Sequence, residues 1–174
     1  MCYPSVRSQD AFVYLNSEPF RPRTLPPHKY KLINIYRLAY RDLTMADAEH
    51  VEQFFPGIEY PIISYGLPFS QACAKHAKQT LGCSKVFVIC SGSLSRNTDV
   101  LERLEAALGK DHLVGVRKGM KPHTMFSELL NVAVEVEKSG ADCIVTVGGG
   151  SLVDAAKYIP FISALSGSFL AQKL

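Results

Sequence analysis

Short apolar runs alternate with longer amphipathic segments from residue 60 onward. In the longer segments the apolar positions recur every three to four residues, as on one face of a helix. The runs predict strands at 60–66, 85–91, 112–119 and 143–147, and the longer segments predict helices at 67–82, 96–109, 121–140 and 151–159. Strands that are apolar at almost every position are typical of a parallel sheet covered by helices on both faces. The pattern therefore predicts an α/β fold.

Capping residues and prolines predict where these helices begin and end. Asn97 or Thr98 is expected to cap the helix at 96–109. Pro122 is expected in the first turn of the helix at 121–140. Pro160 lacks a backbone donor, so the last helix should kink or end at this residue. The serine-rich stretch just before residue 96 is expected to be a loop.

The first 58 residues lack this order. Five prolines fall within residues 1–29, which predicts a largely irregular, poorly ordered extension. Residues 31–43 fit either a short helix or a strand, and residues 44–55 fit a helix that starts at Thr44 or Asp47. The expected division is an N-terminal extension at 1–58 and one folded domain at 59–174.

Composition and charge limit the possible classes of partner and the possible cellular compartment. The chain has 174 residues and a formal net charge of +3, and no dense Lys/Arg stripe favours nucleic acid. No uncharged apolar stretch is long enough to span a membrane, and the N-terminus lacks the apolar core of a secretory signal. The five cysteines form no CxxC pair, which indicates a reduced, cytoplasmic protein. An excess of Arg and Lys in residues 1–41 leaves a mitochondrial transit peptide as the alternative.

Gly148, Gly149 and Gly150 separate the apolar run at 143–147 from a predicted helix. The first amides of a helix have no intrahelical acceptors, and the helix dipole favours an anion beside them. Glycines let the backbone approach a phosphate with no Cβ in between. A tight turn without a ligand is the alternative, although a single glycine would suffice for it. The sequence therefore predicts a phosphate site at this turn.

Polar residues that follow the glycines in the sequence offer further contacts to a bound ligand. Ser151 can cap the helix or donate its hydroxyl to a phosphate oxygen. Asp154 and Lys157 are three residues apart and therefore share one helix face. Asp154 can accept a hydrogen bond from a ribose or substrate hydroxyl, whereas Lys157 can offset phosphate charge or pair with Asp154. The spacing matches neither the GxGxxG dinucleotide fingerprint nor a P-loop.

A second small polar turn, Ser91, Gly92 and Ser93, follows the strand at 85–91. The carboxyl ends of parallel strands share one edge of the sheet, and ligands bind at this edge. The turn fits the rim of a cofactor site and an ordinary turn equally well. No two of the five histidines are four residues apart, so no metal site is predicted within the chain.

Several separated segments resemble the iron-containing alcohol dehydrogenase family. The main segment is GADCIVTVGGGSLVDAAKYI, and ISYGLPF, VFVICSGSLSRNTDVLERLEAALG and VGVRKGMKPHTMFSELL precede it in the family's order. The resemblance runs from Ile63 to Ile159 and is greatest to a fungal branch with maleylacetate-reductase-like members. It implies a Rossmann-like domain that binds NAD or NADP. It also implies a separate helical domain that holds a divalent metal, iron or zinc, through one Asp and three His.

The resemblance assigns roles in cofactor binding. The glycine turn at 148–150 and Ser151 match the pyrophosphate-binding loop. Asp154 matches a residue that lines the nicotinamide side of the cleft, and Lys157 matches the lysine that closes the motif.

The resemblance also assigns roles in cofactor binding to the residues of the second turn. Ser91 stands where many relatives have an Asp that holds the adenosine ribose, and a serine there is compatible with NADP as well as NAD. Gly92 and Ser93 continue that rim, and Lys121 lies near a family position that contacts the cofactor.

The function implied by the resemblance is hydride transfer between nicotinamide and an alcohol or carbonyl substrate, with the metal polarising the substrate oxygen. The metal domain has no counterpart here, because residues 160–174 offer no metal ligand. The chain is therefore expected to be the cofactor-binding part of a dehydrogenase, with no catalytic residue of its own and no activity alone. The expected exposed apolar surface comprises Phe161, Ile162, Leu165, Phe169 and Leu170.

Two other functions stay open from the sequence. One is a standalone nucleotide-binding module without catalysis. The other is a related enzyme with the same glycine turn, such as a glycerol or polyol-phosphate dehydrogenase or a dehydroquinate-synthase-like lyase. The substrate, the metal and any homo-oligomeric state are not fixed by these residues.

Overall fold

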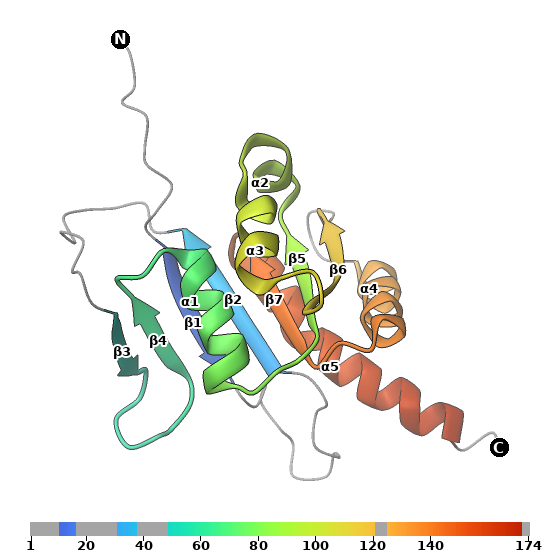
Figure 1. Ribbon diagram of the computed structural model, residues 1–174. Helices are drawn as coiled ribbons and strands as arrows, with labels where there is room; N and C mark the ends of the chain where they lie inside the picture. Colours follow the sequence, from blue (N-terminus) through green and yellow to red (C-terminus); the bar gives the residue numbers. More distant parts are fainter. Residues whose placement is uncertain (1–10, 17–30, 38–48, 121–124, 172–174) are drawn as a thin grey trace.

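The computed structural model describes residues 11–16, 31–37, 49–120 and 125–171. Its strands are β1 (Ala11–Asn16), β2 (Lys31–Arg37), β3 (His50–Gln53), β4 (Ile62–Tyr65), β5 (Val86–Cys90), β6 (Leu113–Lys118) and β7 (Cys143–Val147). Its helices are α1 (Phe69–Lys75), the π-helical turn η1 (His76–Thr80), α2 (Gly92–Asn97), α3 (Val100–Leu108), α4 (Phe126–Ser139) and α5 (Gly150–Ala171). Figure 1 shows the helices lying on both sides of one sheet.

The strands form a 7-stranded sheet in the order β3-β4-β1-β2-β7-β5-β6. β7 pairs in parallel with β2 on one side and with β5 on the other, and β5 pairs in parallel with β6. The predicted parallel sheet flanked by helices is therefore confirmed. The remaining strands, β1, β4 and β3, extend the sheet through antiparallel pairs.

The segment predicted as an irregular extension supplies three strands of this sheet. Residues 31–37 form β2, which settles the choice between strand and helix in favour of a strand. Residues 50–53 form β3 rather than part of a helix, because pairing with β4 outweighs the local helical signal. The first residue of the folded domain therefore lies before residue 59.

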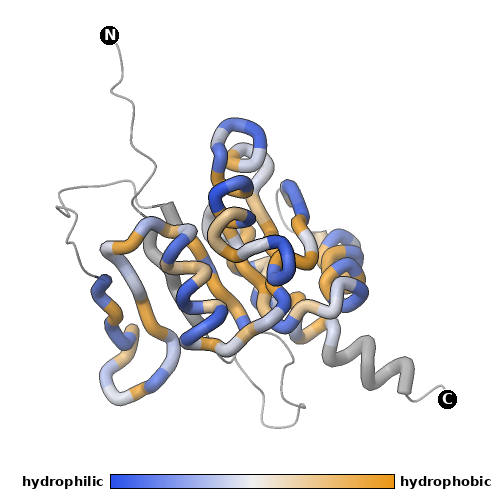
Figure 2. The backbone as a smooth tube through the Cα atoms, viewed as in Figure 1, coloured by the Kyte–Doolittle hydropathy of each residue, from blue (hydrophilic) through white to orange (hydrophobic). Residues whose placement is uncertain are grey.

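Each face of the sheet buries its own apolar core. Since side chains alternate along a strand, Val145 of β7 faces α1 and α3, whereas Ile144 faces α4 and α5. Every residue of β5 and of β7 is buried. Figure 2 shows hydrophobic positions along these central strands and on the helix faces turned toward them. Burial on both faces explains why these strands read as continuous apolar runs.

The serine-rich stretch predicted as a loop is the short helix α2. Ser91 is its N-cap, and Ser91 Oγ accepts a hydrogen bond from Leu94 N at 3.4 Å. Asn97 is the last residue of α2, and α3 begins only at Val100. The predicted cap at Asn97 or Thr98 is therefore wrong, because Thr98 Oγ1 donates to the Leu94 carbonyl at 2.6 Å and ends α2 instead.

Helix α5 passes through Pro160 and continues to Ala171, so the predicted end at this proline is wrong. The ring removes one intrahelical hydrogen bond, but Pro160 is buried and α5 packs on both α4 and the sheet. Ile162 is only 5% exposed, which corrects its assignment to an exposed apolar surface. Phe161 is half-buried, and the side chains of Leu165, Phe169 and Leu170 lie outside the described part of the chain.

Helix α4 begins at Phe126, and Gly140 ends it in the left-handed conformation with φ of +68°. An L-residue seldom adopts that conformation, which accounts for a glycine at this C-cap. Pro122, predicted in the first turn, belongs to residues 121–124, which the structure does not describe.

Asp142 joins the starting ends of the two central strands. Its carboxylate accepts hydrogen bonds from Ser84 N at 2.9 Å, Ser84 Oγ at 2.8 Å and Lys85 N at 2.9 Å. Burial alone would raise the pKa of Asp142, but these hydrogen bonds lower it below its ordinary value. The carboxylate thus holds the residues before β5 against the first residues of β7.

Asp142→Ala is expected to lower the free energy of unfolding by about 1–3 kcal/mol, because it leaves two backbone amides without their charged acceptor. Urea unfolding at neutral pH measures this loss. Asp111→Ala removes the same charge from an exposed position and should change stability by less than about 0.5 kcal/mol. Equal effects of the two substitutions would contradict the structural role of Asp142.

Candidate functional site

The parallel strands bring the two predicted turns to one edge of the sheet. Cys90 at the end of β5 is paired with Val147 at the end of β7. Ser91 N donates to the Val147 carbonyl at 2.9 Å, and Gly119 N donates to the Cys90 carbonyl at 2.7 Å. The turns that follow β5, β6 and β7 therefore meet, as expected for the carboxyl edge of a parallel sheet.

Gly148 is the closest point of contact between the two turns. A Cβ built on Gly148 would lie 3.0 Å from Ser91 Cβ and 3.1 Å from Leu152 Cδ2. Its amide also faces the Ile35 carbonyl of β2 at 3.4 Å. A side chain at position 148 would therefore push Ser91 or Leu152 away by a few tenths of an ångström, whether or not a ligand binds.

Gly149 and Gly150 have a different environment. Both are exposed, and a Cβ on either residue would meet no atom within 4 Å. Packing within the described chain therefore gives no reason for glycine at these two positions. Their backbone therefore lies beside open space, a cradle in which a phosphate stays a prediction.

Helix α5 begins at this cradle. The Gly149 carbonyl accepts hydrogen bonds from Leu152 N at 3.1 Å and from Val153 N at 3.3 Å, so it closes the first turn. Ser151 is the second residue of α5 and is exposed. It lies inside the helix and therefore does not cap it, which leaves its hydroxyl for a ligand.

Asp154 and Lys157 lie one turn further along α5. Lys157 Nζ donates to Asp154 Oδ1 at 3.0 Å, and the exposed fractions of the two side chains are 52% and 68%. The predicted pairing of the two residues is therefore present. A contact of Asp154 with ribose or substrate stays a prediction.

The second turn lies beside the glycines. Ser91 Oγ lies 3.6 Å from the position of a Gly148 Cβ and 3.4 Å from Ser93 Oγ. A Cβ on Gly92 would lie 3.6 Å from the Gly119 Cα, so Gly92 packs against the turn after β6. The structure thus brings Ser91, Gly92 and Ser93 together with the glycine turn. Lys121 belongs to residues 121–124 and lies outside the described part of the chain.

A buried pair of polar side chains lies next to this edge of the sheet. Thr146 of β7 donates its hydroxyl to Asn34 Oδ1 of β2 at 2.6 Å, and the two residues are 0% and 1% exposed. Asn34 and Thr146 are also partners in the strand register. The only sequence signal for this pair is one polar residue within each of two apolar runs.

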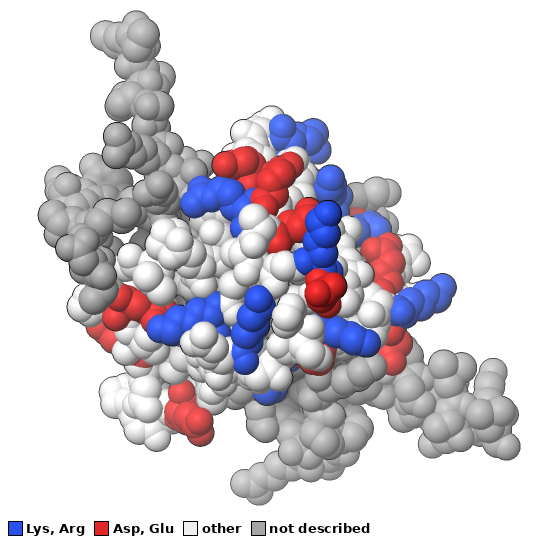
Figure 3. All heavy atoms as spheres, viewed as in Figure 1, with Lys and Arg blue, Asp and Glu red and all other residues white. Residues whose placement is uncertain are grey.

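Burial raises the pKa of Cys73 to about 12 and that of Cys90 to about 11, so neither thiol ionises at neutral pH. Within residues 11–16, 31–37, 49–120 and 125–171, no three His, Cys, Asp or Glu side chains converge to hold a metal. Among the same residues, no helix is long and apolar enough to cross a membrane. Basic and acidic side chains are interspersed on the face shown in Figure 3.

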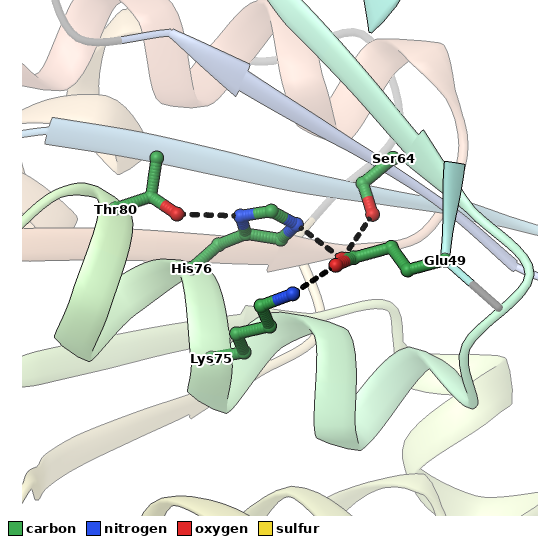
Figure 4. A network of polar contacts seen from close by, with 5 residues as sticks. All are labelled: Glu49, Ser64, Lys75, His76 and Thr80. Carbon is green, nitrogen blue, oxygen red and sulfur yellow. Dashed lines mark hydrogen bonds and ion pairs between the residues drawn. The ribbon is translucent and has the colours of Figure 1, made fainter. Parts of the chain in front are cut away.

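A second polar cluster lies away from this edge, between the β3–β4 hairpin and helix α1 (Figure 4). The Glu49 carboxylate accepts hydrogen bonds from Lys75 Nζ and from Ser64 Oγ, the latter at 2.7 Å. His76 Nε2 lies 2.8 Å from Glu49 Oε1, within ion-pair distance but without the geometry of a directed hydrogen bond. His76 Nδ1 lies 2.8 Å from Thr80 Oγ1.

Burial and polar contacts act in opposite directions on the pKa values in this second cluster. Burial lowers the pKa of His76 below the usual 6.5, although the Glu49 carboxylate acts in the opposite direction. Burial would raise the pKa of Glu49, but the hydrogen bonds from Lys75 and Ser64 and the charge of His76 lower it overall. His76 is 2% exposed and Ser64 is 0% exposed, so the cluster connects elements rather than presenting groups to a substrate.

The structure is thus an α/β domain with an open glycine turn at the carboxyl edge of its parallel strands. The family model for iron-containing alcohol dehydrogenase matches residues 68–172, from the start of α1 to the end of α5. The chain belongs to this family, which confirms the resemblance seen in the sequence.

The chain is similar to two fungal dehydrogenases and to a bacterial one. It is 39% identical to Dehydrogenase FUM7 of Gibberella moniliformis over 64% of this chain and 26% of that protein. It is 34% identical to Dehydrogenase ALT3 of Alternaria alternata over 44% of this chain and 20% of that protein. It is 28% identical to 1-propanol dehydrogenase PduQ of Citrobacter freundii over 47% of this chain and 22% of that protein. The chain thus spans about a quarter or less of the length of these relatives.

Alanine substitutions should separate the two kinds of glycine. Gly148→Ala forces its Cβ against Ser91 and Leu152 and is expected to lower the unfolding free energy by about 1–3 kcal/mol. Gly150→Ala meets open space and should leave stability unchanged or raise it by up to about 1 kcal/mol, since alanine favours the helix. Chemical unfolding measures both values. A destabilised Gly150→Ala variant together with an unaffected Gly148→Ala variant would contradict the described turn.

Acid should weaken the fold through His76. Because the folded chain opposes protonation of His76, the unfolded chain binds that proton more readily below pH 6.5, and stability falls as the pH falls. The urea midpoint is expected to fall between pH 7.5 and pH 5.5, and His76→Gln should flatten this dependence. His112→Gln, which changes a histidine next to β6, is the matched control and should keep the wild-type slope. The same slope in wild type and His76→Gln would refute the assignment.

Proposed function

We propose that this chain is the cofactor-binding part of an NAD(P)-dependent oxidoreductase. In the complete reaction, hydride passes between the nicotinamide and an alcohol or carbonyl carbon. The observation that carries the proposal is the exposed glycine pair, Gly149 and Gly150, at the carboxyl edge of a parallel sheet. Membership in the iron-containing alcohol dehydrogenase family supports it.

The residues of the chain fit the pyrophosphate of a dinucleotide. The first two amides of α5, those of Gly150 and Ser151, lack intrahelical acceptors, and the positive end of the helix dipole lies beside them. Gly149 and Gly150 leave room for phosphate oxygens next to that backbone, and the exposed Ser151 hydroxyl is available as a further donor. In the proposed complex the pyrophosphate lies against these groups.

The other predicted contacts surround the glycine turn in the proposed complex. Ser91, Gly92 and Ser93 lie beside the glycine turn and form the rim for the adenosine ribose. Asp154 and Lys157 are exposed on α5 and lie further along the same helix, toward the nicotinamide side. Lys121 is proposed as an additional cofactor contact.

The substrate class follows from the relatives and is a proposal for this chain. One relative is named as a 1-propanol dehydrogenase, which favours a small alcohol or its carbonyl product. Iron or zinc is the metal that the family implies, but the described residues converge on no metal-binding cluster. No step of the reaction is therefore assigned to a metal held by the described residues.

Titration of the 1–174 chain with NADH and NADPH, followed by nicotinamide fluorescence and melting temperature, tests the proposal. Binding of at least one nucleotide is expected. Gly149→Asp should abolish it without lowering the melting temperature, because the new carboxylate enters the anion cradle and meets no protein atom at its Cβ. Asn131→Asp adds the same charge at an exposed position of α4 and should bind like wild type.

The alternatives give different results in the same experiment. A cooperatively melting chain that binds neither nucleotide, or a Gly149→Asp variant that binds normally, would refute the proposed site. Nucleotide binding without turnover of any alcohol in the complete protein would favour the non-catalytic module. Turnover of glycerol or a polyol phosphate alone would favour a glycerol or polyol-phosphate dehydrogenase.

A further inference from the structure

Arg96 lies at the rim of the proposed cofactor site, in the last turn of α2. Its guanidinium folds back toward the start of that helix, because Arg96 Nη1 lies 3.0 Å and Cζ 3.7 Å from the position of a Gly92 Cβ. The same position lies 3.6 Å from the Gly119 Cα. The guanidinium therefore lies at the junction of the turns that follow β5 and β6, beside the residue that follows Ser91.

The charge of Arg96 is not used within the described part of the chain. Arg96 is exposed, and none of the ion pairs seen among the described residues includes it. Other arginines do have partners, since Arg117 binds both Glu128 and Glu135. An arginine without an acidic partner beside a ligand rim is available to bind an anionic group of that ligand.

Lys118 adds a second cation at the same junction. It is the last residue of β6 and is paired in register with Cys90, the residue before Ser91. Lys118 is exposed, and its ammonium opposes the rise in the Cys90 pKa that burial causes, so the charge lies close to the end of β5. The junction is therefore positive on the side of the rim that faces β6.

Ser91 leaves room for an anionic group because its side chain is small and uncharged. A carboxylate at this position would repel a phosphate at the ribose 2′ position, whereas a serine hydroxyl can donate to it. Ser91 lies between the glycine turn and Arg96 along the edge of the sheet. A ligand that extends from the glycine turn across Ser91 would therefore meet Arg96 and Lys118 next.

We propose that Arg96 binds the 2′-phosphate of NADP(H), with Lys118 supporting it, so that this chain prefers NADP(H) to NAD(H). This inference rests on the proposed function, because it names the cofactor for the same site. A phosphomonoester carries nearly two negative charges at neutral pH and offers three acceptor oxygens. The planar guanidinium donates two parallel hydrogen bonds to such a group, and a ribose hydroxyl has no comparable charge to offer.

Stacking of Arg96 on the adenine ring is the competing role. It would strengthen NADH and NADPH binding equally, because both nucleotides carry the same adenine. The ratio of the two dissociation constants therefore separates the two roles, and it does not depend on turnover.

The test is a titration of the 1–174 chain with NADPH, NADH, 2′,5′-ADP and 5′-AMP at constant ionic strength. Wild type is expected to bind NADPH more tightly than NADH by roughly tenfold or more, and 2′,5′-ADP more tightly than 5′-AMP. Arg96→Gln should weaken binding of NADPH and of 2′,5′-ADP by roughly tenfold or more and leave NADH within about twofold. Lys110→Gln removes one charge from the loop before β6, at the opposite edge of the sheet, and should change neither ratio.

Ser91→Asp provides a second, independent variant. Aspartate is as good an N-cap as serine, so α2 should keep its start. This variant should weaken NADPH selectively and spare NADH. Tighter NADH than NADPH binding in wild type, or an equal loss of both nucleotides in Arg96→Gln, would overturn the inference while the dinucleotide site stands. Binding of neither nucleotide by wild type would overturn the proposed function and this inference with it.

Discussion

The parallel pairing of β7 with β5 is the constraint on which the rest of this structure depends. β7 is buried on both faces and hydrogen-bonded on both sides, by β2 and by β5. Its register places Val147 beside Cys90, so the two turns that follow must start at the same level. Asp142 holds the other end of the same pair through Ser84 and Lys85. The site at the carboxyl edge is therefore positioned by backbone pairing, before any of its side chains acts.

Because of this pairing, the three glycines at 148–150 have two different environments. Gly148 lies where the β5 and β7 turns touch, and a Cβ there would lie only 3.0 Å from Ser91 Cβ. Gly149 and Gly150 lie one and two residues beyond the contact and have open space around them. A turn needed only for chain reversal would require the first glycine and would tolerate side chains at the next two. The glycines that the protein's own packing does not explain are those that face outward, at the start of a long helix, where an anion is favoured.

How far the sequence could predict the structure depended on whether the signal was local. β5 and β7 were predictable because burial on both faces makes every residue of each strand apolar. The glycine turn, Ser91 and α5 followed from the same segments. β1 was missed, β2 was left open between strand and helix, and β3 was predicted as helix, because the partners that fix these strands are not visible in the local pattern. Arg96 was missed because its place beside Gly92 depends on α2, a short helix that serine-rich composition does not indicate.

Strands β1, β2 and β3 bear directly on the position of the glycine turn. β2 forms the far side of the glycine turn, since the Ile35 carbonyl faces the Gly148 amide and Asn34 binds Thr146 beneath it. β2 also pairs with β1, β1 pairs with β4, and β4 pairs with β3. Glu49 attaches this hairpin to α1 through Lys75 and to η1 through His76. A cofactor at the carboxyl edge would therefore rest on a sheet whose stability depends on residues before position 59. For that reason the first 58 residues cannot be separated from the binding domain without exposing β7, the strand from which the glycine turn starts.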